Sequence, residues 1–131
     1  TLVELIVVIA IMAVLAGTVA GVTVTQLNKR TDEANHTQAK KIADTIYEEL
    51  LASVEVGVKK ADMTTAVTDA YGASVVVFTD TPTTGKQFLV TIPEDSVAVD
   101  SREYTVEYKG KQGNKGDIKY KITATGGVVK D

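Results

Sequence analysis

The sequence predicts an α+β fold, in which a long N-terminal α-helix, apolar in its first half and amphipathic in its second, packs on an antiparallel sheet of about four strands. Three observations predict this fold. No charged residue occurs between Glu4 and Lys29. Apolar residues then recur at spacings of three and four, which is the pattern of a helix with one buried side. Beyond residue 74 apolar and polar residues alternate, which is typical of strands with one buried face.

Residues 1–25 are predicted to form an apolar helix that crosses a membrane. As a helix, residues 5–24 would span about 30 Å, which matches the hydrocarbon core of a bilayer. No basic residue precedes this run and no A-x-A-like site ends it, so we expect a retained segment and not a cleaved signal peptide. Lys29 and Arg30 follow the run and are expected at the level of the lipid headgroups.

Residues 26–53 are predicted to continue the helix with a single apolar stripe. The stripe is centred on Ile42, Ile46 and Leu50 and also contains Ala39, Ala43 and Leu51. Charged residues, among them Lys40 and Glu48, fall on the opposite side. A helix with one apolar stripe needs one partner surface, and we expect the sheet to supply it.

Residues 54–131 are predicted to form a globular head. Its first part, residues 54–74, is a connection with a short helix that Asp62 caps and Gly72 ends. Strands are expected at residues 74–79, 87–92, 103–109 and 117–125. The last two form a hairpin across the turn GKQGNKG, which places Glu103 and Glu107 against Lys119 and Lys121.

The composition favours a structural protein over an enzyme. The chain has 131 residues, with 14 basic and 17 acidic side chains, a net charge of −3, one His and no Cys. The absence of Cys excludes disulfides and thiolate chemistry. The sequence also has no Gly-rich phosphate loop, no nucleophile-elbow motif and no Cys/His metal set. We therefore expect no catalytic residue, no metal and no cofactor.

The first residues of the chain, TLVELIVVIAIMAVLA, carry a specific family pattern. They resemble the start of mature type IV pilins and of the related pseudopilins of type II secretion. In that family a prepilin peptidase cuts before a residue that is usually Phe, and the new amine is methylated. This chain begins one residue later in the pattern, so the resemblance implies a methylated Phe before Thr1. Its lack of Cys is similar to the pilins of Gram-positive bacteria, and its apolar helix lacks the Pro that many pilins carry.

The resemblance implies the pilin fold and a structural subunit of a type IV pilus. Such a subunit would lie in the cytoplasmic membrane before assembly and in an extracellular helical homo-oligomer afterwards, serving adhesion or twitching motility. Its partners would be the prepilin peptidase and the inner-membrane assembly platform with its ATPases. The filament core would be packed by Leu2, Val3, Leu5, Ile6, Val8, Ile9, Ile11, Met12 and Leu15.

Glu4 is the one charged residue within the apolar helix. A carboxylate at the centre of a bilayer costs about 2.5–3.5 kcal/mol, and less near a helix start, where the interface and the helix dipole stabilise it. The family resemblance implies that Glu4 pairs with the N-terminal amine of a neighbouring subunit. That pair would fix the axial register, because any other stagger leaves two buried charges unpaired. The alternative is that Glu4 only anchors the helix end at the interface.

Gly17 and Gly21 form a G-x-x-x-G pair in the apolar helix. Such a pair can provide a close-packing face for another helix. The stretch GTVAGVTVT also combines two glycines with six β-branched residues, all of low helix propensity. Many pilins lose helix here in assembled filaments, and we expect partial melting. The alternative is an unbroken helix whose small residues ease crowding.

Four other features are interpreted as surface chemistry. His36 is expected to be a surface helix residue, and the N-x-T pattern at Asn35 carries little weight on a helix. Glu94, Asp95 and Asp100 lack the spacing of a calcium loop and are expected in a solvated loop. A basic cluster in the last hairpin, which other charges dilute, is expected to be solvated, so we do not expect DNA binding. This cluster consists of Lys109, Lys111, Lys115, Lys119 and Lys121.

Other functions remain open at this point. Within the same family, the chain could be a pseudopilin or a minor pilin of a secretion or DNA-uptake system. The head could instead act as an adhesin or a DNA-uptake module. A third alternative is a plain single-pass membrane protein.

Overall fold

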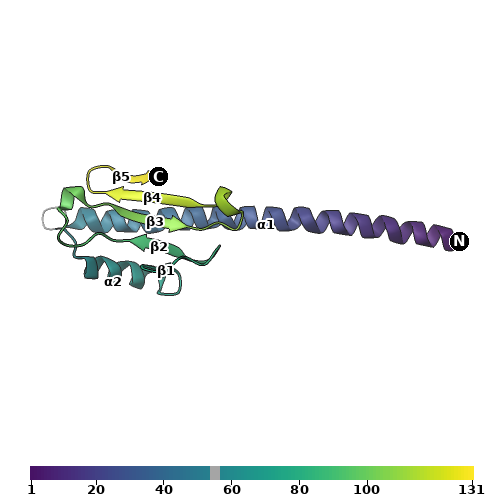
Figure 1. Ribbon diagram of the computed structural model, residues 1–131, viewed down its shortest axis with the longest axis horizontal. Helices are drawn as coiled ribbons and strands as arrows, with labels where there is room; N and C mark the ends of the chain where they lie inside the picture. The colour runs from purple at the N-terminus through teal and green to yellow at the C-terminus, as the bar shows by residue number, and fades with distance from the viewer. Residues whose placement is uncertain (54–56) are drawn as a thin grey trace.

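The computed structural model describes residues 1–53 and 57–131, apart from the side chains of residues 19, 20 and 22. Its longest element is α1 (Leu2–Ala52), one helix of 51 residues. At about 1.5 Å per residue α1 is roughly 75 Å long. Its N-terminal half projects far beyond the rest of the chain (Figure 1). The predicted helical continuation to residue 53 is confirmed to within one residue, and residues 54–56 of the predicted connection lie outside the described residues.

The head contains a five-stranded sheet whose strands follow one another in sequence order. All neighbouring strands are antiparallel except the first two, which are parallel. The predicted α+β class with a mostly antiparallel sheet is therefore confirmed. The strands are β1 (Val76–Val77), β2 (Phe88–Thr91), β3 (Tyr104–Tyr108), β4 (Ile118–Thr123) and β5 (Gly127–Lys130), and short 3-10 turns occur at η1 (Val99–Ser101) and η2 (Gly113–Lys115).

Two details of the sheet differ from the prediction. β1 is much shorter than the expected strand at residues 74–79 and runs parallel to β2, because residues 78–87 carry the chain back before β2 begins. β5 was not predicted at all. It pairs with β4 through a tight turn in which Gly127 has a φ of 69°, a conformation that favours glycine.

The short helix of the connection is α2 (Lys60–Tyr71), and Gly72 ends it with a φ of 94°. The predicted end is confirmed, but the predicted cap is wrong. Asp62 lies inside the first turn, because the helix begins at Lys60 with Lys59 at the N-cap position, three residues earlier than expected. The Asp95 carboxylate from a distant loop accepts a hydrogen bond from the Lys60 N–H at 2.7 Å and so satisfies one free donor of the helix start.

The core lies between the second half of α1, α2 and the inner face of the sheet. Ile42 and Ile46 are fully buried and Leu50 is 3% exposed, so the predicted stripe is confirmed. The assignment of Leu51 to the stripe is wrong. Leu51 is exposed, because it falls to one side of the line through Ile42, Ile46 and Leu50. The helix packs on β3 and β4. Alternating residues of β3 complete the core, and the rings of Phe88 and Tyr108 stack at a centroid distance of 5.4 Å.

Candidate functional site: the exposed half of the long helix

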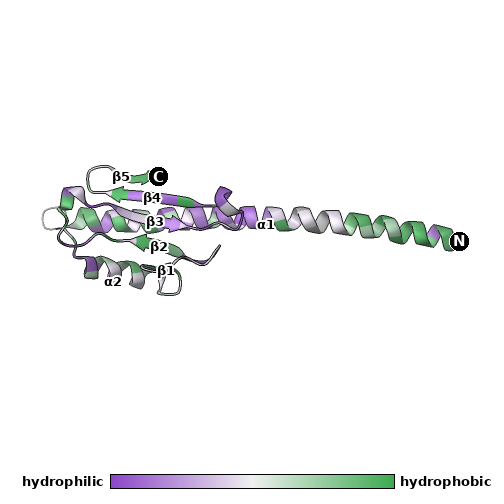
Figure 2. Cartoon of the chain, viewed as in Figure 1, coloured by the Kyte–Doolittle hydropathy of each residue, from purple (hydrophilic) through white to green (hydrophobic). Residues whose placement is uncertain are grey.

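The first half of α1 is apolar around its whole circumference. Between residues 2 and 15 its large apolar side chains are between 50% exposed, at Val7, and 72% exposed, at Leu2 and Val3. Figure 2 shows this part of the helix as an almost unbroken hydrophobic segment. The structure therefore brings the nine predicted core-packing residues together on one surface that the described part of the head does not cover. These residues are Leu2, Val3, Leu5, Ile6, Val8, Ile9, Ile11, Met12 and Leu15.

Such a surface does not stay in water. Moving a Val, Leu, Ile or Met side chain out of water stabilises it by roughly 1.5–3 kcal/mol, and here many such side chains adjoin one another. Within the described residues α1 is the one helix that is long and apolar enough to cross a membrane. The exposed half of α1 therefore indicates membrane association or secretion.

Glu4 lies in the first turn of α1 and is exposed. The first backbone hydrogen bond of the helix joins the Leu5 N–H to the Thr1 carbonyl at 3.1 Å. A carboxylate here meets the positive end of the helix dipole, which stabilises it. No ion pair joins Glu4 to another described residue of the same chain. Its pairing with a neighbouring subunit stays a prediction.

The glycine-containing stretch is helical in the structure. α1 continues through residues 17–25, and the hydroxyls of Thr18 and Thr25 donate to the Val14 and Gly21 carbonyls at 2.9 and 3.1 Å. These bonds satisfy polar groups that would otherwise be stranded in an apolar setting. A Cβ at Gly17 or Gly21 would meet no atom within 4 Å, so both glycines leave their side of the helix open to a partner. Melting in an assembled filament stays a prediction.

The boundary between the exposed and packed halves is set by Asp32, which is 2% exposed. Its carboxylate accepts hydrogen bonds from the Tyr108 hydroxyl at 2.8 Å and from two backbone N–H groups, Lys111 at 2.8 Å and Gln112 at 3.1 Å. Burial alone would raise the pKa of this carboxyl, but these hydrogen bonds outweigh it, so the pKa of Asp32 lies below its ordinary value. The loop between β3 and β4 is thus fastened to α1 by a buried charge.

Neighbouring polar residues extend the fastening. Asn35 donates to the Tyr108 hydroxyl at 3.0 Å and to the Gly85 carbonyl at 3.2 Å. His36 Nε2 lies 2.6 Å from the Gly116 carbonyl oxygen and must donate, because a carbonyl only accepts. Burial beside the Asp32 carboxylate raises the pKa of Tyr108 to about 12.

This network corrects one sequence interpretation and reveals what it missed. His36 is not a surface residue but is partly buried and contacts the head. The side-chain amide of Asn35, in the N-x-T pattern, donates two hydrogen bonds. The signal was present in the sequence. Asp32, Asn35 and His36 continue the apolar stripe at helical spacing, so polar residues on a buried line should have predicted a hydrogen-bond network.

The far end of the head is held by Arg102, which is 6% exposed. Its guanidinium donates to the carbonyls of Val97, Val58 and Asp95 at 2.9–3.0 Å. Lys60 forms an ion pair with Glu94 at 2.6 Å, so two of the three acidic loop residues hold α2 in place. Asp100 is exposed, as expected for a solvated loop.

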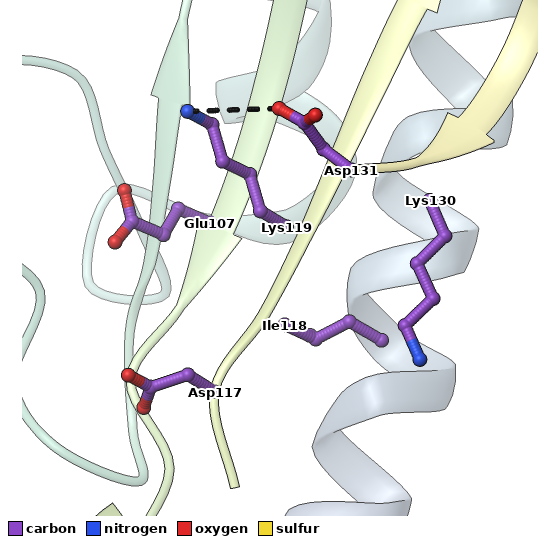
Figure 3. Close-up of a pocket in the computed structure, with 6 residues that line it drawn as sticks. All are labelled: Glu107, Asp117, Ile118, Lys119, Lys130 and Asp131. Atoms are coloured by element: carbon purple, nitrogen blue, oxygen red, sulfur yellow. Dashed lines mark ion pairs between the residues drawn. The ribbon is translucent and has the colours of Figure 1, made fainter. Parts of the chain in front are cut away.

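Much of the basic cluster of the last hairpin is neutralised within the chain. Lys121 pairs with Glu103 at 2.8 Å, and Lys109 pairs with Glu107 at 3.1 Å, which raises the pKa of Lys109. Lys119 lies opposite Glu107 in the sheet, as predicted, but forms its ion pair with Asp131 at 3.9 Å. Figure 3 shows this last pair among the residues that line a pocket, with the side chains of Glu107 and Lys130 extending away from the pair.

In the described part of the chain, no three His, Asp or Glu side chains come together as metal ligands. Comparison with protein-family models, curated proteins and solved structures gives no match. The geometry alone describes the chain as a pilin-like architecture with an apolar N-terminal helix.

Proposed function

We propose that the chain is the structural subunit of a type IV pilus, a filament in which the exposed halves of α1 from many subunits pack together. The observation that carries the proposal is the division of one continuous helix. Its second half is buried against a sheet, while its first half exposes apolar side chains on every side and carries a single carboxylate at its start. The N-terminal pattern TLVELIVVIA supports the same assignment.

The same surface would serve two environments in turn. Before assembly, the apolar half of α1 lies in the cytoplasmic membrane, where lipid chains cover it. After assembly, neighbouring helices cover it, and dispersion contacts between close-packed side chains hold the filament together. Because both environments are apolar, the transfer between them is close to balanced, and an assembly platform can drive it in either direction.

Glu4 would supply register more than cohesion. In the filament core its carboxylate would face the N-terminal amine of an adjacent subunit, and each charge would offset the desolvation of the other. Removing one member of a buried pair costs about 3–5 kcal/mol, because the other member is left uncompensated. A helical polymer repeats that cost at every subunit.

The variant Glu4→Ala tests the proposal in cells that carry the assembly machinery. We expect wild-type amounts of the variant in the membrane fraction and few or no filaments in the sheared surface fraction. Glu48→Ala is the matched control, because Glu48 is an exposed glutamate on the packed half of the same helix. A normal filament yield from Glu4→Ala would remove the assembly role of Glu4.

The abundance of the chain separates the major subunit from the nearest alternative. A major pilin would be the dominant protein of sheared filaments, whereas a pseudopilin or a minor pilin would be a trace component. Quantitative mass spectrometry of purified filaments measures this directly.

A further inference from the structure

The edge of the head contacts α1 directly after the apolar segment of the helix. The loop between β3 and β4, which includes η2, lies beside α1 where the helix leaves the head (Figure 1). Asp32 holds this loop through the backbone N–H groups of Lys111 and Gln112. The position of the loop is therefore fixed relative to the start of the apolar segment, and Figure 2 shows that both the loop and the adjoining turn of α1 are hydrophilic.

Four cations belong to the two segments that meet at this boundary, and we name them the basic collar: Lys29 and Arg30 from α1, and Lys111 and Lys115 from the loop. Lys29 and Lys115 line one hollow, and the side chain of Lys111 lies near Gly85. All four are exposed. In the part of the chain that the structure describes, no ion pair joins any of them to a carboxylate, unlike Lys109, Lys119 and Lys121 of the same hairpin. The collar therefore has positive charge available for a partner outside the subunit.

The collar also has a shape that admits a small anionic group. A hollow between α1 and the loop is lined by Lys29 and Lys115 together with His36 and Gln112, and one exposed carboxylate, Glu33, lies on its wall. The Asp32 carboxylate also lines the hollow and already accepts three hydrogen bonds. Lysines can bind the phosphate group of a lipid in such a hollow as point charges.

The length of α1 places the collar at the level of lipid phosphates. Glu4 and Lys29 are separated by about 37 Å along a helix that rises about 1.5 Å per residue. A bilayer has a hydrocarbon core of about 30 Å and is about 40–45 Å thick with its headgroups. With Glu4 at one interface, the collar therefore lies among the headgroups of the other.

We propose that the basic collar binds the phosphate groups of anionic lipids while the subunit waits in the membrane. This inference rests on the proposed function, because it requires that the apolar half of α1 spans a bilayer. Lys29 and Arg30 alone would be an ordinary flank of a membrane helix. The structure adds Lys111 and Lys115 from a distant part of the sequence, in a loop whose backbone the Asp32 carboxylate holds against α1.

The test uses the full chain in lipid vesicles, with a fluorophore on the exposed residue Asn114 through Asn114→Cys, which creates the chain's single thiol. Headgroup spin-labelled lipid quenches the fluorophore when the loop is docked. We expect stronger quenching in phosphatidylglycerol-containing vesicles than in pure phosphatidylcholine, and less quenching at high salt. Lys111→Gln with Lys115→Gln should lower the docked population by roughly tenfold or more, since each lysine near an anionic surface contributes appreciably.

Lys40→Gln with Lys41→Gln is the matched control, because these exposed lysines lie farther along α1 and the charge change is the same. The control should quench as the wild type does. The proposed lipid binding by the collar would be overturned by equal quenching in both kinds of vesicle. An equal loss of quenching in the two double variants would also overturn it. Alkaline extraction of the same vesicles separates this result from a failure of the proposed function. A chain that is inserted but undocked contradicts only the collar, whereas a chain that does not insert contradicts both.

Discussion

The two halves of α1 share one backbone and follow opposite rules of burial. Ile42 and Ile46 in the second half are fully buried against the sheet, whereas Ile9 and Ile11 in the first half are more than half exposed. Both pairs are isoleucines in the same uninterrupted helix. The difference comes from the neighbours of these residues, because one apolar stripe can be covered by one sheet, whereas a helix apolar all round cannot. The second half of α1 therefore contributes to the core of the head, whereas the first half leaves its apolar side chains without a partner in the described head.

The largest expected effect is the difference in unfolding free energy between a substitution at Ile46 and one at Ile9. Ile46→Ala leaves a cavity between α1 and the sheet and should lower the free energy of unfolding of the head by about 2–5 kcal/mol. Ile9→Ala should change it by less than about 0.5 kcal/mol, because Ile9 has no partner in the described head. Denaturant unfolding of the full chain in nonionic micelles measures both. Equal losses would show that the two halves are not energetically separate.

The next effect concerns the boundary between the halves. Asp32→Asn keeps one acceptor but turns an amide group toward backbone donors, so we expect a loss of about 1–3 kcal/mol in unfolding free energy. The pKa of Asp32 is lowered by folding, so its contribution is present above the ordinary value of 3.8 and is lost as the pH falls below it.

Glu33→Gln is the control for Asp32, because it alters the adjacent, exposed carboxylate. It should change the unfolding free energy by less than about 0.5 kcal/mol. Faster amide exchange in residues 110–116 of Asp32→Asn alone would support the fastening of the loop. The same exchange rate in both variants would contradict it.

A smaller effect appears at alkaline pH and only in the packed half. Folding raises the pKa of Tyr108 from 10.0 to about 12, so its contribution is complete below pH 10 and is lost as the pH rises toward 12. Tyr108→Phe should remove part of this loss, and Tyr120, whose pKa burial also raises, should retain some of it. The midpoint of denaturant unfolding as a function of pH measures the change. A profile for Tyr108→Phe that matches the wild type would reject this assignment, and Ile9→Ala should match the wild type.

The smallest effect belongs to the exposed half. Gly17→Ala and Gly21→Ala should each favour the helix by about 1 kcal/mol and slow amide exchange in residues 17–25, while leaving the head unchanged. Ala13→Gly should do the opposite around residue 13. If residues 17–25 of wild-type filaments already exchange as slowly as residues 5–12, the expected melting does not occur.

The overall fold could be predicted from the sequence more completely than the details of the head. The spacing of apolar residues distinguished the two halves of α1 and located Ile42, Ile46 and Leu50, because the buried side of a helix is set by residues close together in the sequence. It also placed the hairpin of β3 and β4. It missed the parallel pairing of β1, because the direction of a strand depends on the path of the chain between strands and not on its own pattern.

The polar contacts of the head were the least predictable. Asp32 finds its partners about 80 residues away along the chain, and nothing around Arg102 indicates that it binds three carbonyls in two loops. Such contacts are fixed by tertiary packing. The apolar half of α1, in contrast, was readable from the sequence because it has almost no tertiary contacts to override its composition.

The continuity of α1 also has a mechanical consequence. In the proposed filament, a pull on a head would pass into the filament core along a single helix, with no flexible linker between the head and the core. The weakest part of that path is the stretch of residues 17–25, where glycines and β-branched residues meet. Each residue there that passes from helix to extended chain lengthens by nearly 2 Å, from about 1.5 Å to about 3.3 Å. A subunit could therefore lengthen by more than 10 Å while its head stays folded. The proposed filament would then be extensible without any unfolding of the heads on its surface.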